Sequence, residues 1–311
     1  MGPEMRDKVL AELRKVVVEK DREARLLLTA LLAGGHVLLE GVPGVSKTLL
    51  TKSFAKCMEL DFGRVQFTPD MLPLDIVGGF IFNMKERELE FRKGPAFTNI
   101  LLADEINRAP PKVQSALLEA MQEGQVTIEG RTEALPSPNM VIATQNPIEF
   151  QGVYPLPEGQ LDRFMLKVTM SYPSVGTESA VIRRNISGDD FPGITGVVSR
   201  GELAEAFAVV KHVKVSEEML DYLARLAAET RTDVRVLLGA SPRAIIQLAA
   251  CAKASAYLSG RDYIVPDDVK DLAVDALSHR VKLKQSSTIT GEATSTSAVI
   301  HEIIEKVKPP R

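Results

Sequence analysis

The sequence has little that would tie it to a membrane or to an oxidising compartment. Its longest strongly apolar run, residues 26–32, is far shorter than the about 20 residues that cross a bilayer. The charged helical pattern of residues 1–20 lacks the apolar segment of a signal peptide. The two cysteines, Cys57 and Cys251, fit no metal-binding or redox spacing. We therefore expect a cytoplasmic protein with two buried free thiols and no membrane anchor of its own.

The sequence also has no tryptophan and no large excess of one charge. Its 311 residues include 38 Lys and Arg against 41 Asp and Glu, a formal net charge of −3. A protein that coats nucleic acid by charge needs many contacts between basic side chains and phosphates, so this balance argues against nucleic acid as the principal partner. The chain length and the ordinary shares of hydrophobic (45%) and charged (25%) residues indicate a globular protein of about two domains.

The first half of the chain alternates short apolar runs with amphipathic helical patterns. Most of the runs are continuously apolar, as strands are when helices cover both faces of a sheet. We therefore expect an α/β fold with a parallel five-stranded sheet. Its predicted strands lie at residues 37–39, 65–67, 100–103, 140–143 and 164–168.

Two antiparallel hairpins are expected in addition to this sheet. Residues 78–82 and 89–91 flank a polar turn, and residues 125–135 can fold back on themselves at Glu129-Gly130. Both hairpins interrupt the helix-and-strand alternation, so we interpret them as insertions in the α/β core.

Strand signals nearly vanish after Tyr172-Pro173-Ser174, where we place a domain boundary. The prediction is an α/β core over residues 1–174 and a small helical domain over residues 175–311.

Helices in the second half are predicted from apolar side chains at helical spacing. Ser241-Pro242 is a typical helix start, with Ser as the cap and Pro at the first helical position. The Ser- and Thr-rich residues 285–297 are expected to form a loop before a last helix at 298–307. The remaining helical patterns lie at residues 220–227, 245–252 and 269–277.

A glycine-containing motif follows the first predicted strand and precedes a helical pattern. Strand, loop and helix is the context of a phosphate-binding loop, in which backbone N–H groups and the helix N-terminus face the phosphates. Lys47 would reach the β- and γ-phosphates of a nucleotide, and the Thr48 hydroxyl would bind Mg²⁺. The residues expected to bind the nucleotide are Gly41, Val42, Pro43, Gly44, Val45, Ser46, Lys47, Thr48 and Leu49.

This motif departs from the general pattern at one position. Ser46 stands where the pattern has Gly, and Gly admits backbone angles and close approach that Ser does not. The alternative interpretation is a strand-to-helix turn with incidental glycines.

Two carboxylates, Asp104 and Glu105, end the third predicted strand. Ligands of open α/β sheets bind at the carboxyl ends of parallel strands, which is where this pair falls. Asp104 would hold Mg²⁺ and Glu105 would polarise the attacking water. The alternative is a solvated acidic turn.

With these motifs in place, the chain resembles the AAA+ ATPases and, among them, the MoxR family. The resemblance covers nearly the whole length, and a small residue in place of the third glycine is familiar in that family. The stretches that carry it are residues 41–48, 67–78, 103–109, 114–121, 143–147, 156–164 and 239–244.

The resemblance implies roles for three further residues. Asn146 matches the sensor 1 residue that orients the attacking water, and Arg163 matches an arginine finger that reaches the nucleotide of a neighbouring subunit. Arg243 matches sensor 2, which touches the γ-phosphate from the lid. A cation near a helix N-terminus is unfavourable, which hints at an external anion beside Arg243. The alternative for Asn146 is a turn residue. Arg163 could instead form an ion pair with Asp162 or another neighbour, and Arg243 could be a solvent-exposed residue of the first helical turn.

The resemblance also implies a ring, expected to be a hexamer, that hydrolyses ATP with Mg²⁺ and remodels or matures a client protein. Such clients carry a von Willebrand factor A domain, and the hairpins would project toward the ring pore or the client. Three other functions stay open: a nucleic-acid motor or loader, a slow ATP-dependent switch, and a small-molecule kinase.

Overall fold

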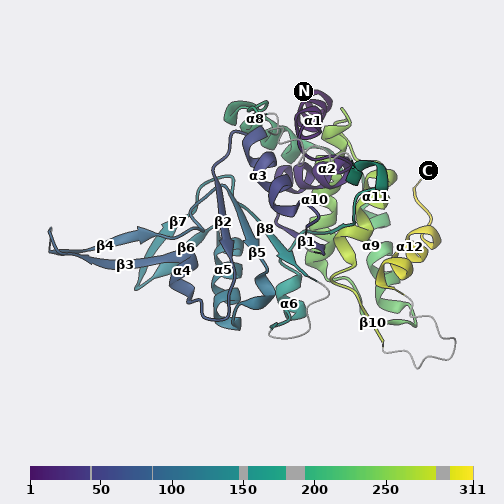
Figure 1. Ribbon diagram of the computed structural model, residues 1–311. Coiled ribbons are helices and arrows are strands. Elements are labelled where there is room, and N and C mark those ends of the chain that lie inside the picture. Colours follow the sequence, from purple (N-terminus) through teal and green to yellow (C-terminus); the bar gives the residue numbers. More distant parts are fainter. Residues whose placement is uncertain (43, 86, 147–152, 180–192, 285–294, 311) are drawn as a thin grey trace.

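The computed structural model describes every residue except 43, 86, 147–152, 180–192, 285–294 and 311. A five-stranded sheet with strand order β2-β5-β8-β1-β9 forms its centre (Figure 1). All four neighbouring pairs are parallel, which confirms the predicted α/β sheet. The strands are β1 (Val37–Gly41), β2 (Phe62–Gln66), β5 (Ile100–Asp104), β8 (Met140–Gln145) and β9 (Leu166–Met170).

The three central strands, β5, β8 and β1, are apolar along most of their length because both faces of the sheet are buried there, whereas the edge strands β2 and β9 carry exposed polar residues. In β5, Ile100 and Leu102 enter one hydrophobic core while Leu101 and Ala103 enter the other. Helices α4 (Pro73–Val77) and α5 (Pro111–Glu123) cover the second core. The first core is covered by α1 (Gly2–Leu13), α2 (Asp21–Leu32) and α3 (Lys47–Cys57), together with helices from the second half of the chain.

The second half forms the predicted helices and, before them, α8, which was not predicted. They are α8 (Arg200–His212), α9 (Glu217–Thr232), α10 (Pro242–Leu258), α11 (Pro266–Leu277) and α12 (Thr296–Lys306). Serine hydroxyls cap four of them by accepting a hydrogen bond from the first-turn backbone, which supports the sequence argument made for Ser241. Most of the predicted loop at 285–297 lies outside the described residues.

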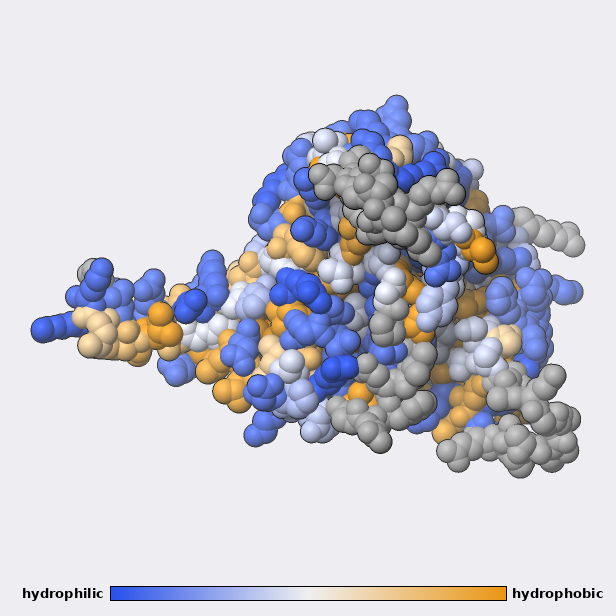
Figure 2. Space-filling view, in the orientation of Figure 1, coloured by the Kyte–Doolittle hydropathy of each residue, from blue (hydrophilic) through white to orange (hydrophobic). Residues whose placement is uncertain are grey.

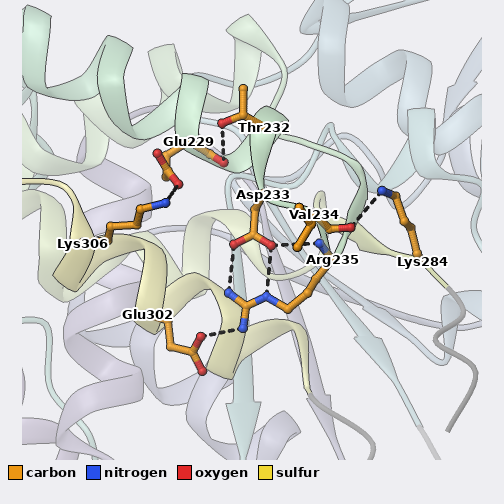
Figure 3. Close-up of polar contacts among 8 residues, drawn as sticks. All are labelled: Glu229, Thr232, Asp233, Val234, Arg235, Lys284, Glu302 and Lys306. Carbon is orange, nitrogen blue, oxygen red and sulfur yellow. Dashed lines mark hydrogen bonds and ion pairs between the residues drawn. The ribbon is translucent and has the colours of Figure 1, made fainter. Parts of the chain in front are cut away.

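A short ribbon and a polar cluster hold α12 in place. Strands β10 (Val236–Leu238) and β11 (Lys282–Leu283) pair antiparallel, and they were not predicted because such short strands show no alternation. Arg235 donates to both carboxylate oxygens of Asp233 and to Glu302 on α12 (Figure 3). This pairing holds the pKa of the Asp233 carboxyl down at about 2.

The N-terminal helices join the two halves of the chain. A Cβ on Gly2 would lie 1.9 Å from the Tyr257 carbonyl oxygen, so only glycine allows α1 to approach α10 this closely. Arg22 on α2 forms a 2.6 Å ion pair with Asp275 on α11. The hydrophobic core on this side runs unbroken from the sheet into the second half. The domain division at residue 174 therefore stays a proposal.

Both predicted hairpins are present. Strands β3 (Gly78–Asn83) and β4 (Glu88–Lys93) form an arm that projects from the body (Figure 1). The second hairpin joins β6 (Gln125–Ile128) and β7 (Arg131–Ala134), and the Arg131 guanidinium lies 5.0 Å from the centre of the Phe80 ring in β3. Figure 2 shows hydrophobic side chains along one side of the arm and hydrophilic ones along the other.

No helix in the described part of the chain is both long and apolar enough to cross a bilayer.

Candidate functional site

The glycine-containing loop connects β1 to α3, as its sequence predicted. Gly41 packs so closely on β9 that a Cβ would lie 2.7 Å from the Met170 carbonyl oxygen. Gly44 has φ +85°, a left-handed conformation that favours glycine. Val45 is buried in the core and anchors the loop, while Val42 and Leu49 pack against the same core. Pro43 lies outside the described residues.

Ser46 adopts the conformation that the missing glycine would provide. Its backbone angles are φ 64° and ψ 25°, in the left-handed region. A left-handed conformation costs a residue with a Cβ about 1–2 kcal/mol. The loop therefore takes a left-handed turn at this position although the residue is not glycine, and it carries strain there.

Lys47 and Thr48 are the first two residues of α3. The Lys47 ammonium turns back over the loop and donates to the Gly41 carbonyl oxygen at 2.7 Å. The first turn of α3 contains no acidic residue, and within the described structure no side chain caps it. Its backbone N–H groups and helix dipole can therefore face an anion.

Asp104 and Glu105 lie at the carboxyl end of β5, on the same edge of the sheet as the loop. Asp104 is 8% exposed, and its carboxylate accepts from the Thr144 hydroxyl at 2.6 Å and from Arg64 Nη2 at 2.8 Å. The Glu105 carboxylate accepts from Gln66 Nε2 at 2.6 Å and lies 3.0 Å from Arg108 Nε. Both acids are thus held by neighbouring residues.

Thr144 forms hydrogen bonds with both residues of this acidic pair. Its side chain is fully buried, and its hydroxyl accepts from the Glu105 backbone N–H at 2.8 Å while donating to Asp104. No role was predicted for Thr144, Arg64 or Gln66. Their position beside Asp104 follows from the pairing of β5 with β8 and β2, which the sequence does not encode locally.

Asn146 follows β8 directly and is 7% exposed. Because β8 lies between β1 and β5, Asn146 reaches the same edge as the loop and the acids. The structure therefore brings together all the predicted residues of this edge that it describes.

Arg163 and Arg243 lie at the opposite edge. Arg163 precedes β9, and β9 starts beside the start of β1, since Val37 pairs with Leu166. The strand from Val37 to Gly41 spans about 13 Å at 3.3 Å per residue, which separates Arg163 from the loop. Arg163 Nη1 donates to the Leu118 carbonyl oxygen of α5 at 2.7 Å.

The two arginines line one hollow of ≈ 200 Å³ with residues 34–36, at the amino end of β1. At its wall, His36 Nδ1 accepts from the Val141 N–H and Nε2 donates to the Met121 carbonyl oxygen, each at 3.0 Å. Burial lowers the pKa of His36 to about 4, so the imidazole is neutral. Within one chain, then, Arg163 and Arg243 line the same hollow, at the opposite edge of the sheet from the loop.

Comparison with known proteins agrees with this architecture. Residues 36–166 match the ATPase family associated with various cellular activities (AAA), and residues 228–303 match the AAA lid domain. Chaperone MoxR1 of Mycobacterium tuberculosis is 42% identical, with 98% of this chain and 82% of that protein covered. The uncharacterized protein YeaC of Bacillus subtilis is 44% identical over 97% of this chain and 94% of its own length. A crystal structure from Cytophaga hutchinsonii, assigned as an ATPase, superposes with a TM-score of 0.90 at 43% identity and covers 100% of this chain and 97% of its own.

Proposed function

Because the chain belongs to the MoxR family of AAA+ ATPases, we propose that it hydrolyses ATP at a site shared by two subunits and uses the energy to remodel or mature a partner protein. The observation that carries this proposal is the division of the predicted residues between two edges of the sheet. The loop and the acids occupy one edge, while Arg163 and Arg243 occupy the other. A neighbouring subunit can supply the arginines that a chain cannot bring to its own loop.

In this proposal the loop binds the phosphates of ATP. The uncapped first turn of α3, the Lys47 ammonium and the left-handed residues Gly44 and Ser46 form a cradle that suits an anion. Mg²⁺ fits beside it, since a protein contributes only one or two oxygen ligands to Mg²⁺ on a nucleotide. Thr48 and Asp104 would hold the metal, which neutralises charge on the phosphate oxygens. Asp104 already pairs with a cation, the Arg64 guanidinium.

Glu105 and Asn146 would orient and activate the attacking water. Glu105 now pairs with Arg108 and accepts from Gln66. A carboxylate oxygen that is engaged by these partners cannot contact a water, so Glu105 has to leave Arg108 before it can orient one. The neighbour's Arg163 then stabilises the charge that develops on the γ-phosphate, and its Arg243 adds a second cation from the lid.

The assembly would be a ring, and we propose a hexamer whose hairpins contact the client. The exposed apolar side chains of the β3–β4 arm support this contact. Proteins with a von Willebrand factor A domain are the client class that we propose from the family. We also propose a cytoplasmic location, which the two buried free thiols support.

Mixed oligomers test the shared site. Arg163→Ala should abolish hydrolysis while ATP binding persists, whereas Lys47→Ala should abolish binding itself. Mixing Arg163→Ala with Glu105→Gln subunits should restore activity, because some sites then combine an intact Glu105 with an intact Arg163. If the mixture stays inactive, the finger does not act between subunits.

The client can be identified with Glu105→Gln subunits held in ATP, which should stall and accumulate bound protein. Mass spectrometry of the captured material should find a protein with a von Willebrand factor A domain. Recovery of DNA or replication proteins would instead favour a nucleic-acid motor. Turnover that stays slow even with the partner added would favour an ATP-dependent switch.

A further inference from the structure

Arg280 lies at the seam between the helical lid and the segment that carries Arg163. Its side chain is 2% exposed, and it lies three residues after the end of α11. Nη2 donates to the carbonyl oxygens of Asp162 at 3.2 Å and Phe164 at 2.6 Å, and Nε lies 3.2 Å from the Asp162 carboxylate. Asp162 and Phe164 flank Arg163, so Arg280 holds the backbone on both sides of it.

The same guanidinium also contacts the first turns of α10. Nη1 lies 3.5 Å from the Ala244 carbonyl oxygen, and Nη2, whose two hydrogens are shared among three acceptors, also contacts the Gln247 side-chain oxygen. Ala244 directly follows Arg243, and Gln247 lies one turn farther along the helix. A planar guanidinium with five donors can engage both segments at once, which a lysine ammonium cannot do with the same geometry.

Two other lid side chains strengthen this seam. The Ser241 hydroxyl donates to the Asp162 carboxylate at 3.2 Å, and His279 Nε2 donates to the Phe164 carbonyl oxygen at 2.8 Å. Burial lowers the pKa of Arg280 to about 10, which leaves the guanidinium charged at neutral pH. A charge buried this deeply is tolerated only when it is paired and hydrogen-bonded, so Arg280 favours the arrangement in which both segments stay docked.

We propose that Arg280 is a positioning residue for ATP hydrolysis, which locks the segment at 162–164 to the start of α10 so that Arg163 and Arg243 reach a neighbour's nucleotide as one rigid unit. The inference rests on the proposed function, because it assumes that the arginines serve the neighbouring subunit. Groups that stabilise a transition state have to be held in place, and a misplacement of about 1 Å can cost about a hundredfold in rate.

The first test compares Arg280→Met with wild-type protein in kcat, ATP affinity and Tm. We expect kcat to fall about a hundredfold while the dissociation constant for ATP changes less than about twofold. Arg280→Lys keeps the positive charge but lacks the planar set of donors of a guanidinium, so it should recover part of the rate. It also replaces Arg280→Met as the test variant if Arg280→Met does not fold. Lys282→Met is the matched control, because Lys282 pairs across the same seam with Glu158 but both side chains are more than half exposed.

Mixed oligomers separate positioning from simple damage to the fold. Arg280→Met mixed with Glu105→Gln should regain activity, whereas Arg280→Met mixed with Arg163→Ala should not, because those two defects affect the same edge. Weakened ATP binding with unchanged kcat would overturn the proposal. So would a failure to regain activity with Glu105→Gln under conditions where Arg163→Ala does regain it. If the mixture of Arg163→Ala with Glu105→Gln also stays inactive, the proposed function is wrong, and the proposal for Arg280 is wrong as well.

Discussion

At Ser46 the backbone preference of the residue conflicts with the conformation that the loop adopts. It stands in a left-handed conformation at φ 64°, directly before the α3 residues that would bind phosphate. The sequence showed that a glycine was missing, but it could not show whether the loop would change shape or the serine would accept the strain. The loop keeps its shape because Val45 is buried in the core and Gly41 packs tightly on β9.

We expect Ser46→Gly to stabilise the nucleotide-free protein by up to about 1 kcal/mol, because relief of left-handed strain exceeds the added flexibility of the unfolded chain. Urea unfolding would measure this change. Ser53→Gly is the matched control, since Ser53 lies inside α3, where replacing serine by glycine should destabilise by about 0.5 kcal/mol. Equal destabilisation by both changes would contradict the conformation described for Ser46.

Among the elements, the β3–β4 arm has one apolar side, and the outer part of that side is not buried by any other part of the described chain. Phe80 packs against Phe91 near the base of the arm, with ring centres 5.3 Å apart and ring planes tilted by 53°. Farther out, Phe82 pairs across the strands with Leu89, and these side chains are 56% and 55% exposed. Alternation along the strand places Ile81 on the other side. An exposed apolar surface of this kind is typical of a contact site.

Under the proposed function, the double change Phe82→Ser and Leu89→Ser should reduce client capture by Glu105→Gln subunits at least about tenfold, because burying one such side chain is worth roughly 1.5–3 kcal/mol. ATP hydrolysis without client should stay within about twofold of the wild-type rate. Ile81→Ser removes apolar surface from the opposite side and should leave capture unchanged. Equal loss in all the variants would show that the arm tolerates no change, and would remove the argument for an apolar client surface.

At the scale of the whole molecule, two enclosed histidines make stability depend on pH. Burial lowers the pKa of His36 to about 4 and that of His279 to about 3, below the usual value of about 6.5 for an unfolded chain. The unfolded chain therefore binds more protons than the fold. The stabilisation is fully present above pH ~6.5 and is lost as the pH falls toward the folded-state values.

We expect the free energy of unfolding to drop by about 2 kcal/mol per histidine between pH 7.5 and pH 5, measured by urea unfolding. The low pKa of Asp233, held down by Arg235, acts in the same direction but only below about pH 4, so the two contributions separate. His36→Gln should lower stability at pH 7.5 and remove about half of the pH dependence. An unchanged slope in that variant would mean that His36 is not the titrating group.

The sequence by itself determined the elements and much of the chemistry of this protein. Short apolar runs located the five strands, with β2 and β9 shifted by one to three residues from the predicted bounds. The Ser241 cap specified one helix start, and the loop and the acidic pair followed their strands as predicted. These features are encoded within a few neighbouring residues, by periodicity, capping and turn chemistry, so they can be predicted before the chain is folded.

Only the tertiary structure decided which of these elements meet. Strand order placed Thr144 and Arg64 on Asp104, and the parallel start of β1 and β9 put Arg163 at the edge opposite the loop. Docking of the lid then brought Arg280 between the backbones beside Arg163 and Arg243. These contacts join residues from 36 to more than 110 positions apart, and they depend on the packing of whole helices and strands, for which a local pattern carries no signal.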